Sequence, residues 1–200
     1  MKKEFGLYIH IPFCRQKCFY CDFPSFAGRE KKIDKYLQAL EQEFALLRQR
    51  LYPKDNVRDT ESKFAPRTIY IGGGTPTALN AHQMKKILKI VQKYVSVGEA
   101  EEFTVEMNPG TVDREKLLLL QQAGVNRLSV GVQSFDDHCL QKIGRIHTAQ
   151  DAVNTIELAH NLGFDNISLD LIYGLPQQDR EILTKSVERA LTLPVQHISI

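Results

Sequence analysis

The chain has 200 residues, of which 42% are apolar and 25% are charged, a composition typical of globular rather than disordered proteins. Its 26 basic and 24 acidic residues give a net charge of +2, which argues against a nucleic-acid-binding module that depends on a basic surface. No apolar run reaches the roughly 18 residues that span a bilayer, and the N-terminus lacks the apolar segment of a signal peptide. We therefore expect a cytoplasmic protein, whose four cysteines stay reduced and serve a purpose other than disulfide bonding.

Short apolar runs alternate with amphipathic segments along the chain. The runs predict buried strands, since each has four to six residues and is bounded by Gly, Pro, Asn or Asp: 7–11, 68–71, 103–107, 127–132, 167–172 and 197–200. Apolar residues three and four positions apart predict helices between them, over 33–51, 80–95, 113–122, 148–163 and 179–191, with a short helical turn over 136–143. Asn80 with Gln83 has the pattern of a capping box, and Gly124 is placed to end the third helix.

Strands that alternate with helices predict an α/β fold, in which right-handed crossovers build a parallel sheet. No G-x-G-x-x-G motif opens the first unit, so we expect a barrel or partial barrel rather than a dinucleotide-binding sheet. The polar segment 52–62 is predicted to be a mobile surface loop. Because the sequence ends inside its last predicted strand, we expect a partial barrel cut at the start of strand six.

Three of the four cysteines lie close together, directly after the first predicted strand. Cys14, Cys18 and Cys21 form C-x3-C-x2-C at the strand end where barrel enzymes place their active sites. Three thiolates on one loop favour a [4Fe–4S] cluster with one open iron. The alternative is a zinc-binding protein, but structural zinc takes four ligands. His10 would have to face the loop from within a strand, and Cys139 lies 118 residues beyond Cys21.

The segment Tyr8-Ile-His-Ile-Pro-Phe-Cys14-Arg-Gln-Lys-Cys18-Phe-Tyr20-Cys21 resembles the cluster motif of radical S-adenosylmethionine (SAM) enzymes. The resemblance implies a partial (βα)6 TIM-like barrel and a [4Fe–4S] cluster bound by the three cysteines. It also implies that SAM chelates the open iron and is cleaved by one electron to a 5′-deoxyadenosyl radical.

Further candidate residues stand at the ends of the later strands. The glycines of 71–77 allow a close backbone approach to a ligand, although an ordinary turn would also explain them. Glu106 and Asp170 lie among apolar strand residues, where a carboxylate must be paired or functional. A core carboxylate satisfied by Arg127 or a helix N-terminus is the alternative for Glu106, and a buried ion pair with an arginine is the alternative for Asp170.

The resemblance assigns SAM contacts to nine residues: Tyr8, Tyr20, Gly73, Gly74, Thr75, Glu106, Gln133, Arg145 and Asp170. Arg145 suits the SAM carboxylate, because a guanidinium can bind a carboxylate through two parallel hydrogen bonds. Core packing is the alternative role for the two tyrosines.

Taken together, the motifs from Tyr8 to Pro176 resemble the oxygen-independent coproporphyrinogen III oxidase family. The sequence Asp22-Phe-Pro-Ser that follows Cys21 resembles its heme chaperone branch of the HemW type, whereas the decarboxylating oxidases usually carry a further cysteine there. This implies a protein that binds heme and delivers it to an apo-hemoprotein, with a reductant protein as a further partner. The alternative is an oxidase that converts coproporphyrinogen III to protoporphyrinogen IX.

The same resemblance describes residues 1–200 as one radical SAM core domain, without the C-terminal region that handles substrate or heme in the family. Whether the protein is an enzyme is left open. So is a peripheral association with the inner membrane.

Overall fold

The computed structural model describes residues 4–51 and 63–200, so the predicted loop over 52–62 lies outside the described residues. Its main sheet is parallel and follows the spatial order β1-β4-β5-β6-β7-β8. These strands are β1 (Gly6–Ile11), β4 (Thr68–Gly73), β5 (Glu102–Met107), β6 (Arg127–Gln133), β7 (Ile167–Leu171) and β8 (His197–Ser199). The sheet is open, since β1 and β8 each pair with one neighbour, and the predicted partial barrel is confirmed.

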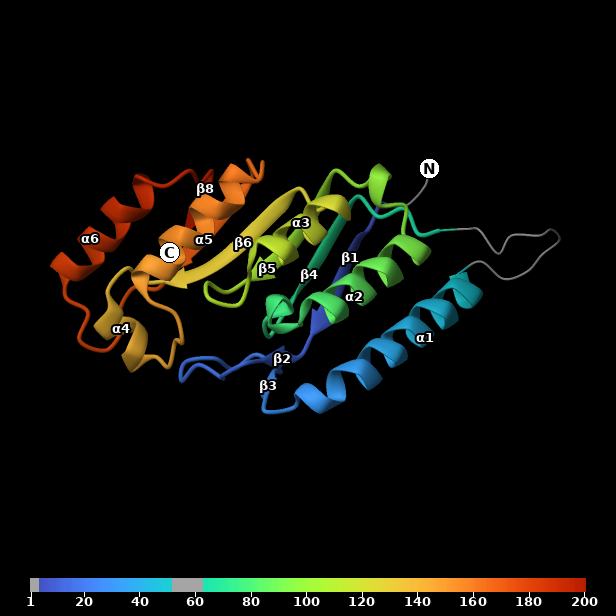
Figure 1. Ribbon diagram of the computed structural model, residues 1–200, viewed down its shortest axis with the longest axis horizontal. Helices are drawn as coiled ribbons and strands as arrows, with labels where there is room; N and C mark the ends of the chain where they lie inside the picture. Colours follow the sequence, from blue (N-terminus) through green and yellow to red (C-terminus); the bar gives the residue numbers. More distant parts are fainter. Residues whose placement is uncertain (1–3, 52–62) are drawn as a thin grey trace.

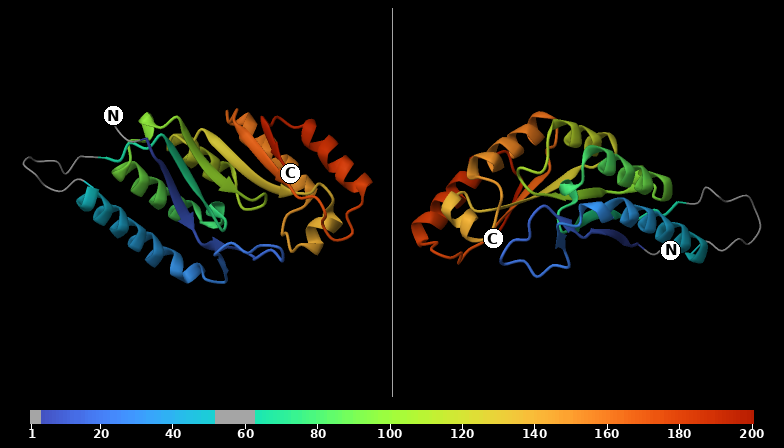
Figure 2. Two further views of the ribbon diagram at one scale, coloured as in Figure 1. Left: turned by 180° about the vertical axis from the view of Figure 1, so that it is seen from behind. Right: turned by 60° about the horizontal axis from the view of Figure 1, so that its bottom comes forward.

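The long helices cover one face of this sheet (Figures 1 and 2), while the short α4 lies at the carboxyl ends of the strands. The helices are α1 (Ile33–Leu51), α2 (Ala81–Tyr94), α3 (Arg114–Gln122), α4 (Asp137–Lys142), α5 (Ala149–Asn161) and α6 (Arg180–Leu191). Within residues 4–51 and 63–200, no helix has both the length and the apolar character to cross a bilayer.

Local signals place the helix ends where the sequence predicts them. The Asn80 side chain accepts from the Gln83 amide at 2.9 Å, and the Gln83 side chain accepts from the Asn80 amide at 3.2 Å. Thr148 and Asp151 form the same reciprocal capping box at the start of α5. Gly124 follows α3 with φ of +91°, the left-handed conformation that ends a helix.

The strands alternate strictly between an apolar and a polar face. Phe103, Val105 and Met107 of β5 are buried in the core against the helices, while Thr104 and Glu106 point to the opposite face. The other strands repeat this pattern. The face of the sheet that the helices do not cover, here called the inner face, is therefore lined by hydroxyl, carboxylate and aromatic side chains. A polar inner face at the strand ends is the setting of the site described next.

Short elements absent from the sequence prediction connect the strands to this site. Strands β2 (Phe13–Cys14) and β3 (Phe26–Ala27) form a small two-stranded sheet. Single 3-10 turns occur over η1 (Glu30–Lys32), η2 (Pro76–Ala78) and η3 (Val97–Glu99).

Candidate functional site

A cavity of about 200 Å³ lies at the carboxyl ends of the strands. It is lined by ten of the twelve residues that the sequence singles out: Cys14, Cys18, Tyr20, Cys21, Gly74, Thr75, Glu106, Gln133, Arg145 and Asp170. They come from β2 and the loop that follows it, the turn after β4, strands β5, β6 and β7, and the loop after α4. The parallel strand order explains the convergence, because successive strand ends meet at one edge.

The cysteine loop, residues 12–26, is stabilised by hydrogen bonds between its two ends and within it. The Phe26 amide donates to the Pro12 carbonyl at 2.9 Å, which joins the two ends of the loop. Within it, Lys17 Nζ donates to the carbonyls of Phe23 and Ser25, at 3.0 and 3.4 Å. The Lys17 side chain therefore ties the loop to itself at two points.

The three loop thiols share the cavity and are each half-buried. Among the described residues, no three His, Cys, Asp or Glu side chains lie close enough to hold a single metal ion. A cubane cluster does not require that, since its cysteines bind different irons. Burial raises the pKa of the Cys18 thiol, and the positive charge of Arg145 opposes this effect.

Neither His10 nor Cys139, the two candidates for a fourth zinc ligand, is available to complete a zinc site with the loop thiols. His10 Nε2 hydrogen-bonds the Pro24 carbonyl at 2.9 Å, and His10 Nδ1 hydrogen-bonds Tyr8 Oη at 2.9 Å, so both ring nitrogens are engaged. Cys139 is fully buried in an apolar cluster with Ile143 and Leu175 and does not line the cavity. Burial raises the pKa of Cys139 to about 11, so it is a protonated core thiol.

The glycine-rich turn after β4 packs directly on the start of the cysteine loop. The Gly74 amide donates to the Ile11 carbonyl at 2.9 Å, and the Thr75 amide donates to the Phe13 carbonyl at 2.8 Å. A Cβ on Gly74 would lie 3.0 Å from Cys14 Sγ and 2.8 Å from the Phe13 carbonyl oxygen. Only glycine permits this approach.

Glu106 is satisfied within the site rather than by Arg127. Its Oε1 accepts from Tyr70 Oη at 2.7 Å, and its Oε2 accepts from the Gly73 amide at 3.0 Å. The Arg127 guanidinium instead donates to the hydroxyls of Thr104 and Ser168. Burial, followed by the bond to Glu106, raises the pKa of Tyr70. Glu106 thus joins strand β4 to strand β5 while lining the cavity.

Gln133 reaches the cavity through a strained backbone. Its φ is +71°, and the pairing of β6 with β7 shifts register between Gly131 and Gln133. Such a bulge redirects a side chain at the cost of about 1–3 kcal/mol for the unusual backbone conformation. Strain of this kind is typical of functional sites.

Arg145 contacts the cysteine loop from the opposite wall of the cavity. Its Cζ lies 5.9 Å from the centroid of the Tyr20 ring, and its Nη2 donates to the Gly131 carbonyl at 3.0 Å. Its Nε is buried without a hydrogen-bond partner among the described residues. Burial raises the pKa of Tyr20, which hydrogen-bonds Cys18. A cation with an unused donor therefore borders the thiols.

Among the described residues, Asp170 has no ion-pair partner, contrary to the alternative considered from the sequence. Across residues 4–51 and 63–200, no hydrogen bond or ion pair engages its carboxylate. Burial raises its pKa, and the more distant charges of Arg127, His197 and Arg145 lower it less. A partly buried carboxylate without a protein partner fits a ligand-binding role.

Two predicted SAM contacts do not line the cavity. Tyr8 is 53% exposed, stacks on Tyr70 with ring centroids 6.0 Å apart, and hydrogen-bonds His10. The amide of Gly73 is used by Glu106. Their SAM contacts stay predictions.

Several lining residues were not assigned from the sequence, among them Lys17, Ser25, Asn108, Ser129 and Gly131. The sequence could have indicated Asn108 as a site residue, since it directly follows strand β5 in Met-Asn-Pro-Gly. No feature of the sequence indicates Ser25 as a site residue. Its hydroxyl is buried without a partner among the described residues.

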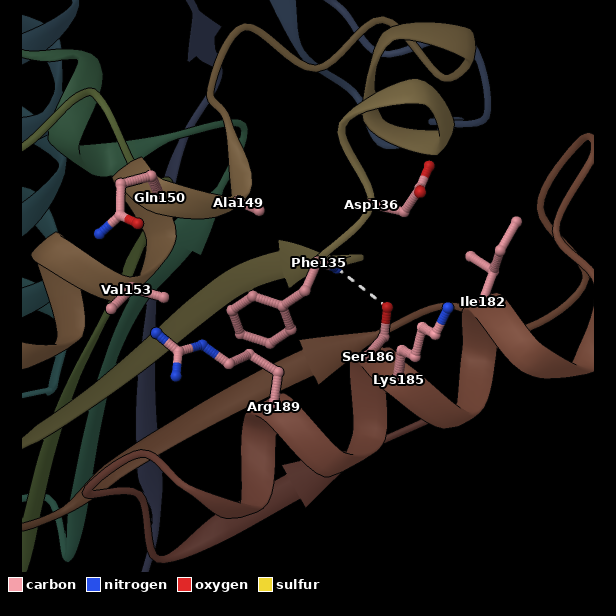
Figure 3. A pocket seen from close by; sticks show the side chains of 9 residues that line it. All are labelled: Phe135, Asp136, Ala149, Gln150, Val153, Ile182, Lys185, Ser186 and Arg189. Atoms are coloured by element: carbon pink, nitrogen blue, oxygen red, sulfur yellow. Dashed lines mark hydrogen bonds between the residues drawn. The ribbon is translucent and has the colours of Figure 1, made fainter.

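A second cavity, of about 300 Å³, lies between α5 and α6 and contains none of the predicted residues (Figure 3). Ser186 on its wall accepts a hydrogen bond from the Phe135 amide at 3.1 Å. The chemistry-bearing side chains gather in the first cavity, which we treat as the functional site.

The family model of the Radical SAM superfamily matches residues 8–190. The chain belongs to the radical SAM superfamily. Membership implies a [4Fe–4S] cluster and SAM as cofactors. This radical SAM chain is 44% identical to the heme chaperone HemW of Bacillus subtilis (strain 168), over 96% of its own length and 48% of that protein. It is 40% identical to the heme chaperone HemW of Escherichia coli (strain K12), over 97% of its length and 49% of that protein.

Among solved structures, the radical SAM chain resembles coproporphyrinogen III oxidase (HemN) from Escherichia coli, described as a radical SAM enzyme. The TM-score is 0.82 at 30% identity, covering 98% of this chain and 44% of that one. The family resemblance and the fold predicted from the sequence are thereby confirmed. The radical SAM chain spans about half the length of the curated relatives it matches.

Proposed function

We propose that this chain is the radical SAM core of a heme chaperone, and that its cluster and SAM occupy the cavity at the strand ends. The observation that carries the proposal is the convergence of three thiols with Arg145, Asp170 and Glu106 on one cavity. Cys14, Cys18 and Cys21 hold the cluster, and the side chains across the cavity hold SAM. When bound, these cofactors supply an electron donor and a cleavable sulfonium.

The donor set fits these cofactors. Three thiols supply the soft ligands that an iron–sulfur cluster requires. The glycine turn leaves room beside Cys14, since a Cβ on Gly74 would crowd its sulfur. The Nε of Arg145 and the carboxylate of Asp170 have no partner in the part of the chain that the structure describes. They provide opposite charges for a zwitterionic amino acid and for ribose hydroxyls.

Heme is proposed as the cargo, with an apo-hemoprotein as its acceptor and a reductant protein as a further partner. Support comes from the similarity to HemW heme chaperones and from Asp22 and Phe23, which stand where the oxidases usually carry a further cysteine. Both side chains are exposed, and Phe23 borders the cavity. Cytoplasmic residence and peripheral membrane attachment remain parts of the same proposal.

Heme titration of the anaerobically reconstituted protein tests the chaperone function. We expect a Soret band that saturates at stoichiometric heme, followed by transfer of the heme to an apo-hemoprotein added in excess. A protein that has no heme site, used at equal concentration, controls for nonspecific partition of heme. The absence of a Soret change at stoichiometric heme would contradict the proposal.

The oxidase is the second candidate, favoured by the likeness to coproporphyrinogen III oxidase of Escherichia coli. An anaerobic assay with coproporphyrinogen III, SAM and a low-potential reductant distinguishes the two. The chaperone proposal predicts no protoporphyrinogen IX. Its formation together with 5′-deoxyadenosine would favour the oxidase.

A further inference from the structure

Two consecutive hydrogen bonds, here called the relay, connect Asn108, which directly follows strand β5, to the candidate cluster ligand Cys14. Asn108 Nδ2 donates to Thr75 Oγ1 at 3.0 Å, and Thr75 Oγ1 donates to Cys14 Sγ at 3.6 Å. Since the amide nitrogen can only donate, the Thr75 oxygen accepts there, and its proton remains for the sulfur. The relay thus fixes the direction in which the hydroxyl points.

The backbone holds this hydroxyl against the sulfur. The Thr75 amide is bonded to the carbonyl of Phe13, the residue directly before Cys14. Gly74 brings the turn close enough, because it has no Cβ to strike the sulfur. Thr75 is only 3% exposed, so solvent does not compete for its hydroxyl. The contact is preorganised by two strand ends that lie 61 residues apart in sequence.

We propose that Thr75, oriented by Asn108, raises the reduction potential of the cluster held by Cys14, Cys18 and Cys21. One-electron reduction adds negative charge to the cluster and its thiolates. A hydroxyl that donates to a thiolate stabilises the reduced form more than the oxidised form, and hydrogen bonds to sulfur are an established determinant of cluster potentials. The inference rests on the proposed function, because it requires the cluster.

This assignment differs from the SAM contact that the family resemblance implies for Thr75. The hydroxyl proton is directed at Cys14 rather than into the cavity, although the residue lines the cavity. The effect must therefore be visible without SAM. A pure SAM contact would leave the potential of the SAM-free cluster unchanged.

The test is an anaerobic redox titration with dithionite, in which the electron paramagnetic resonance signal of the reduced cluster is followed without SAM. Thr75→Val keeps the shape and removes the hydroxyl, so we expect a more negative midpoint potential. Thr75→Ser restores the donor and should return the potential toward wild type. Asn108→Leu removes the orienting donor and should shift the potential in the same direction by a smaller amount.

Thr104→Val is the matched control, because Thr104 is also buried but donates to Glu102 Oε1 at 2.7 Å and not to Cys14. A wild-type potential in Thr75→Val, or an equal shift in Thr104→Val, overturns the inference. If Thr75→Val takes up no iron, an unchanged potential in Asn108→Leu overturns it. Failure of the wild-type chain to take up a cluster overturns the proposed function and this inference together, and iron content per chain distinguishes that result.

Discussion

Arg145 lies over the ring of Tyr20, with Cζ 5.9 Å from the ring centroid. Tyr20 stands between Cys18 and Cys21, whereas Arg145 follows α4, so the contact joins the cysteine loop to the far wall of the cavity. A cation over an aromatic face contributes about 0.5–2 kcal/mol. The guanidinium is thus held in place while its Nε still lacks a partner among the described residues.

Replacement of Arg145 by Met is expected to weaken SAM binding and to leave the cluster in place. Loss of a charged hydrogen bond costs about 1.5–3 kcal/mol, or roughly a tenfold to hundredfold weaker affinity. Equilibrium dialysis with SAM on the reconstituted protein measures the change, and iron content measures the cluster. Arg189→Met, in the other cavity, is the control. Unchanged SAM affinity in Arg145→Met would refute the role.

Asp170→Asn is expected to lower SAM affinity without lowering the free energy of unfolding. The carboxylate is partly buried and no described residue pairs with it, so its charge carries a desolvation cost in the folded chain. The amide removes that cost, and the free energy of unfolding at pH 7 should stay equal or rise. SAM affinity should nevertheless fall. A variant that loses both stability and SAM affinity would indicate a structural role.

Single replacements of the cysteines are expected to distinguish three cluster ligands from one cysteine that does not bind the cluster. Cys14→Ala, Cys18→Ala and Cys21→Ala should each abolish the [4Fe–4S] cluster, because three ligands leave none to spare. Cys139→Ala should keep it, since that thiol lies in a separate apolar cluster. Anaerobic reconstitution with iron analysis and absorption spectra provides the readout. Equal loss of iron in Cys139→Ala would break the assignment.

The features predicted well from the sequence are those with local causes. Apolar spacing located the six strands and the long helices, and the pair Asn80 and Gln83 located the start of α2, because capping depends on residues three positions apart. The cysteine spacing located the site, since all three ligands sit on one short loop.

The features that were missed depend on contacts between distant segments. Nothing near Thr75 in the sequence indicates that its hydroxyl meets Cys14, or that Asn108 orients it. Likewise, the partners of Glu106 come from β4 and not from Arg127, because the sheet order brings Tyr70 beside it. Tyr8 was assigned by resemblance alone, and its position beside His10 on the edge strand could not be derived from spacing.

Gly74→Ala is expected to damage the site through crowding. The new methyl group would lie 2.8 Å from the Phe13 carbonyl oxygen and 3.1 Å from the Ile11 carbonyl oxygen, and backbone cannot yield as a flexible side chain can. Overpacking of this kind costs about 1–3 kcal/mol. We expect a lower Tm and reduced iron uptake. Gly98→Ala has nothing within 4 Å and should match wild type in both measurements. Normal iron uptake by Gly74→Ala would show that the turn can move.

His147 is expected to make stability depend on pH. Burial, aided by the nearby Arg145 charge, lowers the pKa of His147 to about 4. An unfolded histidine titrates near 6.5, so the unfolded chain binds more protons between these values. Its contribution to stability is therefore fully present above about pH 6.5 and is lost as the pH falls toward 4, on the order of 3 kcal/mol in total.

Chemical denaturation at pH 7 and pH 5 measures this effect. His147 Nε2 donates to the Val132 carbonyl at 3.1 Å, so His147→Gln retains a donor but cannot titrate. The free energy of unfolding of His147→Gln should fall less between the two pH values than that of wild type. His82→Gln, which replaces an exposed histidine, should behave as wild type does. If His147→Gln loses as much stability as wild type, the acid sensitivity lies in other groups.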